Sequence, residues 1–358
     1  YDGNAHGITI TNSDKELEIR YGKEAGIYNL TENPTYINAG TYTVYYQISK
    51  EGYTTITGSK EVIINKASGE IALESNTGEV EYGQINSIDI TGNKSGGELT
   101  CASSDTNVAT CKIENNILQI KGKIAEKTAT ITVTSKGTDN YETAETKYEA
   151  KVTKAANTLT LESSKGDYTY PTGGEVEITE NKSGGTLSCK SNNESVATCK
   201  IEGSKLKVVP GKTAGQATIT VISEGTDNYK EGTFAYLVNT AKGSLNSYTV
   251  TGYSGTYDGK EHGITVESSG ATIKYGTTSG TYDKDTSPKY TDVGTYTVYY
   301  KIEQEGYNTV ESSKQVIITK AEGNVTAPTG KTLTYNGSAQ TLINAGSSNT
   351  GTIQYKLG

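Results

Sequence analysis

The fold is decided by a stretch in the middle of the chain that reads Thr128-Ala129-Thr130-Ile131-Thr132-Val133-Thr134. Small or apolar residues alternate there with threonine, and the pattern returns at Ala217, Ile219 and Val221. A period of two places every second side chain on the same face of an extended strand. One buried and one solvated face are typical of antiparallel sheets. The sequence therefore predicts an all-β fold.

Outward from this stretch, the chain is a series of two kinds of repeat. Unit A contains Gly40–Tyr46, which recurs as Gly294–Tyr300, and unit B contains Asn93–Cys101, which recurs as Asn181–Cys189 at an offset of 88 residues. Fixed spacing of this kind marks tandem domains. We predict five segments, of which the first and last are truncated copies: A1 (1–66), B1 (67–155), B2 (156–241), A2 (242–321) and A3 (322–358).

Composition excludes several classes of function. The 358 residues include 27 Tyr, one Phe, two His and no Trp or Met, and the net charge is −8. An acidic chain without basic clusters is a poor candidate for binding nucleic acid, and no apolar run is long enough for a membrane span. The sequence offers no catalytic, metal-binding or cofactor-binding motif. The lack of Met indicates a mature product or an interior piece.

The junctions between repeats carry no flexible linker. Ile64-Asn65-Lys66-Ala67 runs directly into the next unit, and Val152–Ala155 and Ile318–Ala321 do the same. Without Gly/Ser-rich or Pro-rich spacers, bending between domains should be restricted. We expect domains arranged end to end as a rod, on the order of 150 Å long for four sandwiches.

The B units resemble bacterial immunoglobulin-like (Big) domains. The resemblance rests on the turn within Leu99–Asp105, the Val-Ala-Thr step in Val108–Cys111 and the late strand Gly215–Ile219 of B2. B1 departs from the pattern at Lys127, where the family has glycine before that strand. The A units look like MBG-type repeats of bacterial surface proteins, with Tyr-Asp-Gly near the start and Ile-Thr-Lys-Ala at the end of A2.

Together the two resemblances cover nearly the whole chain. They imply tandem immunoglobulin-like β-sandwich domains of extracellular stalks and adhesins, at a bacterial cell surface. They bring no catalytic residues and no cofactor. The partners they suggest are the cell wall, a glycan or a host protein.

The four cysteines form two equivalent pairs, Cys101 with Cys111 and Cys189 with Cys199. Large apolar residues face one another at these positions in the Big pattern, and the alternation points both cysteines of B1 toward the core. A buried disulfide within each B unit is the favoured interpretation, and it indicates an oxidising compartment. The alternatives are a reduced intracellular chain and a shared zinc site, although zinc ligands usually lie two to four residues apart.

Two further groups of residues are candidate sites. His6 and His262 are equivalent, and Gln340 takes their place in A3, which favours a local hydrogen bond over a metal or pH-sensing role. Asp139-Asn140-Tyr141 and its copy at 227–229 are predicted to be turns that anchor a strand rather than calcium loops.

The tyrosine excess allows a binding role. Tyr45 and Tyr299 fall on the outward parity of their strands, so they are candidate ligand contacts, whereas tyrosines of the opposite parity should fill the core. The leading hypothesis is a structural stalk segment that projects a distal region and is not an enzyme. The alternatives are repeats that bind glycans or host proteins, and a subunit that self-associates into a filament.

Overall fold

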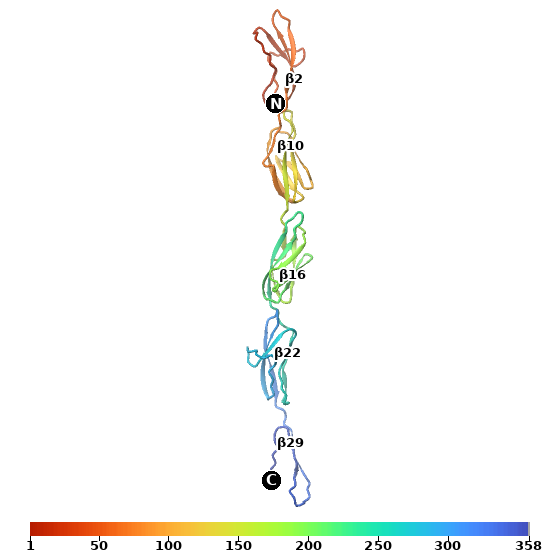
Figure 1. Ribbon diagram of the computed structural model, residues 1–358, viewed down its shortest axis with the longest axis vertical. Helices are drawn as coiled ribbons and strands as arrows, with labels where there is room; N and C mark the ends of the chain where they lie inside the picture. Colours follow the sequence, from red (N-terminus) through yellow and green to blue (C-terminus); the bar gives the residue numbers. More distant parts are fainter. Residues whose placement is uncertain (357–358) are drawn as a thin grey trace. The chain divides into compact units, whose positions relative to one another are not determined.

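The computed structural model describes residues 1–356, and these residues contain strands but no helix. The all-β prediction is confirmed. Contacts divide the chain into two compact units, 1–162 with 178–188 and 221–234, and 163–177 with 189–220 and 235–358. B2 contributes to both units. Figure 1 labels one strand in each repeat, with colours running from red at the start of A1 to blue in A3.

A1 forms a three-stranded antiparallel sheet. Its strands are β1 (Glu18–Gly22), β2 (Gly40–Ser49) and β3 (Ile56–Ile64), in the order β1-β2-β3. Val44 at the centre of β2 is fully buried, and Val62 and Ile64 of β3 complete the buried core. The alternation of β2 places Tyr42 against this core, as the parity predicted.

B1 is a sandwich of two four-stranded sheets, in the orders β5-β11-β10-β7 and β4-β6-β9-β8. The alternating stretch 128–134 lies in β10, where Ala129, Ile131 and Val133 are buried and enter the core between the sheets. The strands are β4 (Ile71–Leu73), β5 (Thr77–Glu81), β6 (Ile85–Asn93), β7 (Leu99–Ser103), β8 (Ala109–Glu114), β9 (Ile117–Gly122), β10 (Lys127–Ser135) and β11 (Ala144–Thr153).

B2 has the same strand sequence. One of its sheets has the order β12-β14-β17-β16, with all pairs antiparallel, and the other has the order β13-β19-β18-β15. Ala217, Ile219 and Val221 are buried in β18, as their counterparts are in B1. The strands are β12 (Leu159–Leu161), β13 (Lys165–Thr169), β14 (Gly174–Asn181), β15 (Leu187–Ser191), β16 (Ala197–Glu202), β17 (Lys205–Pro210), β18 (Gly215–Ser223) and β19 (Gly232–Ala241).

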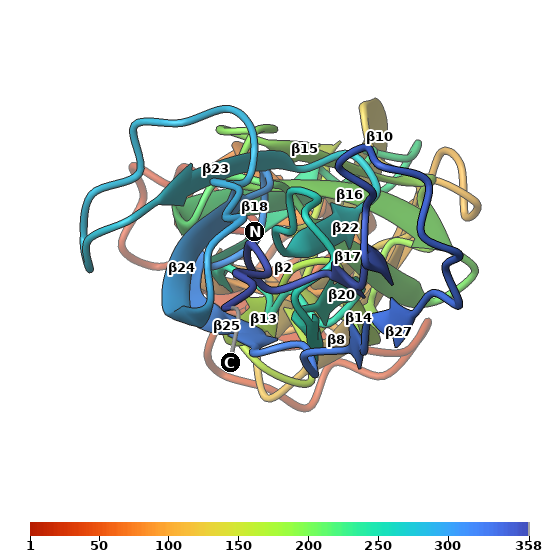
Figure 2. The ribbon, with the colours of Figure 1, turned by 90° about the horizontal axis from the view of Figure 1, so that it is seen from below.

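A2 has a four-stranded sheet in the order β21-β25-β24-β23 and a two-stranded sheet of β20 and β22. Figure 2 shows β24 and β25 side by side, in agreement with their antiparallel register. The strands are β20 (Tyr248–Thr251), β21 (Tyr253–Thr256), β22 (Thr265–Ser268), β23 (Thr272–Gly276), β24 (Gly294–Glu303) and β25 (Val310–Thr319).

Within residues 322–356, A3 has four strands of two residues each. They are β26 (Val325–Thr326), β27 (Thr329–Gly330), β28 (Ile343–Asn344) and β29 (Ser347–Ser348). They pair as two separate antiparallel ladders, β26 with β29 and β27 with β28. The last two residues of the predicted A3 segment, 357–358, lie outside the described part of the chain.

The antiparallel pairing indicated by the alternation is wrong for three pairs of strands. β5 pairs in parallel with β11, β13 with β19, and β21 with β25. Alternation reports which face of a strand is buried, and it carries no information about the direction of the neighbouring strand. In each case the pair joins an early strand of the repeat to its last strand.

Candidate functional sites: disulfides and joints

Each B unit contains one disulfide between two consecutive edge strands. Cys101 of β7 is bonded to Cys111 of β8, and Cys189 of β15 to Cys199 of β16, each with Cα atoms 6.2 Å apart. In B1 the bond therefore joins one sheet of the sandwich to the other. All four cysteines are half-buried, so they lie at the margin of the core and are less enclosed than the sequence suggested.

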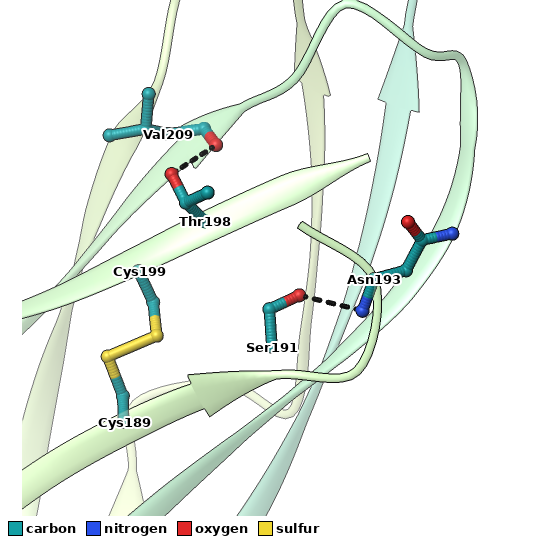
Figure 3. Close-up of a disulfide and its surroundings, with 6 residues drawn as sticks. All are labelled: Cys189, Ser191, Asn193, Thr198, Cys199 and Val209. Carbon is teal, nitrogen blue, oxygen red and sulfur yellow. Dashed lines mark hydrogen bonds between the residues drawn. A yellow bond between two sulfur atoms is a disulfide. The ribbon is translucent and has the colours of Figure 1, made fainter. Parts of the chain in front are cut away.

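Figure 3 shows the Cys189–Cys199 disulfide beside the turn that follows β15. The Ser191 hydroxyl accepts the backbone N–H of Asn193 at 3.1 Å, which fixes the start of that turn. Thr198, next to Cys199, lies opposite Val209 in the β16–β17 ladder and donates its hydroxyl to the Val209 carbonyl at 3.5 Å. The disulfide thus closes a short loop between β15 and β16. The turn after β15 and the pairing of β16 with β17 each have hydrogen bonds of their own.

Tyr45 and Tyr299 lie at the positions that parity predicted, but they are half-buried. Tyr45 stands between Gly22 of β1 and Ser59 of β3, in the centre strand of its sheet, so neighbouring strands flank the ring on both sides. Tyr299 has the equivalent neighbours, Gly276 and Ser313. Both remain candidate ligand contacts, with less exposed surface than their outward parity predicts.

The predicted local hydrogen bond of the two histidines is present in the structure. His6 Nε2 lies 2.9 Å from Asp2 Oδ1, and His262 Nε2 lies 2.8 Å from Asp258 Oδ1. In A3 the Gln340 side chain donates to Asn336 Oδ1 at 2.8 Å. An aspartate–histidine pair and an asparagine–glutamine pair therefore make the same bond, because each supplies a donor and an acceptor at the same separation.

These pairs close a Tyr-Asp/Asn-Gly turn. Gly3, Gly259 and Gly337 have φ angles of +79°, +76° and +74°, a region that favours glycine. The hydrogen bond from His262, with that from the Lys260 backbone N–H, holds the pKa of Asp258 below its usual range. The His6 bond, with the Asn4 N–H, lowers the pKa of Asp2 in the same way.

Asparagines of the Asp-Asn-Tyr loops bind the neighbouring repeat. The Asn140 side chain accepts the backbone N–H of Ala39 at 2.8 Å and donates to Asn38 Oδ1 at 3.1 Å, across about a hundred residues of chain. Asn228, its counterpart in B2, accepts the backbone N–H of Ala125 at 2.9 Å. The predicted turns are therefore also contacts between A1 and B1 and between B1 and B2.

A pair of tyrosines meets edge to face at each of three junctions. The ring centroids are 5.2–5.4 Å apart and the ring planes are inclined by 75–81°. Such pairs contribute about 0.5–1.5 kcal/mol beyond the area they bury. One member follows the loop asparagine or glycine, and the other comes from the preceding repeat. The pairs are Tyr1 with Tyr141, Tyr82 with Tyr229, and Tyr170 with Tyr307.

Backbone hydrogen bonds tie the connecting residue to the same loops. Lys66 and Lys154 also donate their Nζ atoms to the carbonyls of Thr138 and Thr226, each at 2.7 Å. At each junction the residue after the lysine donates its backbone N–H to the loop of the following repeat, and its carbonyl accepts an N–H from the same loop. The bonds run from Ala67 N to Asn140 O, Glu142 N to Ala67 O, Ala155 N to Asn228 O, Lys230 N to Ala155 O, Gly243 N to Gly306 O, and Asn308 N to Gly243 O.

We call this combination of a loop, a tyrosine pair and a bonded connecting residue a joint. Sequence reasoning found the absence of linkers but not the joint itself. The available signal was the recurrence of Lys-Ala or Lys-Gly at 66–67, 154–155 and 242–243, each followed later by a loop ending in tyrosine. Nothing local in either segment indicated that the two would meet.

Within residues 1–356, no three His, Cys, Asp or Glu side chains lie close enough together to hold a metal ion. Asp139 and Asp227, in the Asp-Asn-Tyr loops, are both exposed. The same residues contain no helix that is long and apolar enough to cross a membrane.

Comparison with known proteins gives no family. No family description matches the chain, and no curated protein matches it. Among solved structures, the human desmocollin-1 ectodomain aligns at 10% identity over 89% of this chain and 76% of its own, with a TM-score of 0.28. Domains 4 and 5 of the S-layer protein SbsC align at 20% identity over 40% and 81%, with a TM-score of 0.21. These scores do not place the chain with either protein.

Proposed function

We propose that the chain is a structural segment of an extracellular surface protein, in which tandem β-sandwich repeats hold a distal region away from the surface. The observation that carries this proposal is the recurrence of one joint at three junctions. The joint recurs between repeats of different type: A1 with B1, B1 with B2, and B2 with A2. Selection for a defined angle between neighbours would account for this repetition better than selection for a ligand.

The two disulfides support an oxidising, extracellular compartment. Disulfides persist in oxidising surroundings and are rare in the cytosol. Each closes a loop with a sequence separation of 10 residues, which in the chain-entropy treatment contributes roughly 2.5–3 kcal/mol to a small domain. A bacterial cell surface is the setting that the sequence resemblances favour. Alkylation of the native protein should find no free thiol until it is reduced, and four reactive thiols would contradict an extracellular site.

Small-angle scattering tests the spacer role directly. We expect an elongated particle with a maximum dimension on the order of 150 Å. Asn140→Ala and Asn228→Ala should loosen the first two joints, since each removes an acceptor worth about 1 kcal/mol. The expected result is a shorter mean dimension with unchanged domain stability. Asp139→Ala and Asp227→Ala alter the exposed neighbours of the same loops and serve as matched controls. A compact particle for the unaltered chain would overturn the proposal.

A further inference from the structure

The parallel strand pairs occupy the same place in B1, B2 and A2. In each repeat an early strand lies beside the last strand, over Thr77–Glu81 with 149–153, Lys165–Thr169 with 237–241, and Tyr253–Thr256 with 316–319. The chain therefore enters each repeat at one end of the ladder and leaves it at the other. Pulling on the two ends of such a repeat moves the paired strands in opposite directions along their own axes.

From this geometry we propose that the three parallel ladders are tension clamps, which keep B1, B2 and A2 folded when the chain is pulled lengthwise. A ladder that is sheared along its length must break all its hydrogen bonds together, whereas a hairpin pulled open at one end breaks them one at a time. Resistance to forced unfolding depends on the unfolding barrier rather than on equilibrium stability. The inference goes beyond the spacer role, because a spacer could hold distance without bearing tension.

Each clamp is extended by one further backbone bond at the same position. The residue after the early strand donates its N–H to the last residue of the late strand at 2.8–3.0 Å. The donor in each case is a tyrosine, and two of these three tyrosines also belong to a joint. The bonds run from Tyr82 to Thr153, from Tyr170 to Ala241 and from Tyr257 to Thr319.

Side chains also cross each clamp. Glu79 of B1 accepts from Lys151 Nζ at 2.8 Å, and at the equivalent positions of B2 Asp167 accepts from Asn239 Nδ2 at 2.6 Å. In A2 the Thr319 hydroxyl donates to the Gly255 carbonyl at 3.2 Å. The first two pairs are exposed and add little at equilibrium. When the two strands of a ladder are pulled past each other, however, these side-chain bonds must break as well.

The disulfides lie outside the clamps, between β7 and β8 and between β15 and β16. They therefore cannot hold a clamp closed, but they limit how far a B repeat extends once its clamp has opened. Each removes a loop of sequence separation 10 from the extensible length. At about 3.5 Å per residue, reduction should lengthen each extended B repeat by roughly 30 Å.

A1 provides an internal comparison. Among residues 1–66, which the structure describes in full, no strand pairs with the outer edge of β3, the counterpart of β25. β3 is joined only to β2, in an antiparallel ladder. Residues 1–66 as they stand therefore hold the central strands without a parallel ladder, and this stretch should extend at lower force than B1, B2 and A2.

Single-molecule force spectroscopy on the full chain, held at its two ends, tests the inference. We expect A1 and A3 to extend first and three further unfolding events at distinctly higher force. Two of these events should lengthen by roughly 30 Å after reduction, and the third, from A2, should not change. Three events at the force of A1 would overturn the proposal. Because the readout is mechanical, it stands apart from the scattering test: a rod without high-force events would refute the clamps and leave the spacer role intact.

Variants in B1 separate the clamp from ordinary stability. Glu79→Ala with Lys151→Ala removes the side-chain pair across the clamp and should move one of the three events to lower force. Thr130→Val is the matched control, since it removes the Thr130 hydroxyl bond to Glu149, which joins β10 and β11 at 2.8 Å in the antiparallel ladder. Denaturant midpoints are expected to change little in either variant. An equal drop in force for both, or for neither, would contradict the assignment.

Discussion

A1 and A2 share a sequence plan and differ in how completely their cores are closed. Val44 and Val298, at equivalent positions, are both fully buried. Away from this centre the repeats diverge: Ile302 is fully buried and its counterpart Ile48 is half-buried, while Ile63 is 62% exposed and its counterpart Ile317 is half-buried. In A2, β21 pairs with β25 beside Ile317 and β20 pairs with β22, whereas residues 1–66 begin at the equivalent of Tyr257 and do not include the corresponding segment.

The comparison teaches that the alternating strands alone do not make a closed domain. A1 has three buried core residues, whereas A2 has nine, including Leu245 just before β20.

The largest expected effect comes from making A2 resemble A1. Replacing 246–256 by a Gly/Ser segment of equal length removes β20 and β21, and should destabilise A2 by on the order of 3–5 kcal/mol through lost apolar burial and lost pairing. Hydrogen exchange should then be as fast in β25 as in β3. A peptide with the sequence of 245–256, added as a separate molecule, should slow hydrogen exchange in both β25 and β3. A scrambled peptide should slow exchange in neither strand. Unchanged protection of β25 in the replaced chain would contradict the comparison.

A single core residue should give a smaller effect in the same direction. Leu245 is only 6% exposed and packs in the A2 core. Leu245→Ala should cost about 2–3 kcal/mol, at the low end for such sites because it lies at the edge of the core. Local exchange in β24 and β25 measures the loss, and β2 and β3 of A1 serve as the unaltered reference. An equal change in A1 would show that the two repeats unfold together.

The sequence was sufficient for what depends on strand faces and repetition. The all-β fold follows from the parity of Ile131 and Val133, and the turn bond of His262 was foreseen because Gln340 replaces it. Features that depend on which segments meet were not accessible. Asn140 binds Ala39 across 101 residues, and nothing near either residue encodes that distance. The burial of Tyr299 likewise depends on its neighbours in β23 and β25, which parity does not describe.

Loss of a turn bond should produce a still smaller effect, and one that differs between the repeats. His262 is 15% exposed and stacks on Tyr253 with ring centroids 3.5 Å apart, whereas His6 is 44% exposed. His262→Ala should therefore cost about 1–2 kcal/mol, and His6→Ala less. The double variant Asp258→Asn with His262→Gln copies the pair of A3 and should recover the hydrogen bond but not the stack. Chemical denaturation followed by exchange in each repeat distinguishes these outcomes.

The smallest expected effect is the acid sensitivity of the same turns. The pKa values of Asp2 and Asp258 are lowered in the folded state, mainly by the histidine hydrogen bonds. A carboxyl whose folded pKa is depressed stabilises the fold above its unfolded pKa of about 4, and this contribution is lost as pH falls toward the folded value. Both repeats should therefore lose stability below about pH 4. Asp258→Asn should flatten this dependence in A2 and leave A1 unchanged, when exchange is followed repeat by repeat. If acid weakens the A2 variant as steeply as the unaltered chain, then carboxyls other than Asp258, rather than this turn, determine the response of A2 to acid.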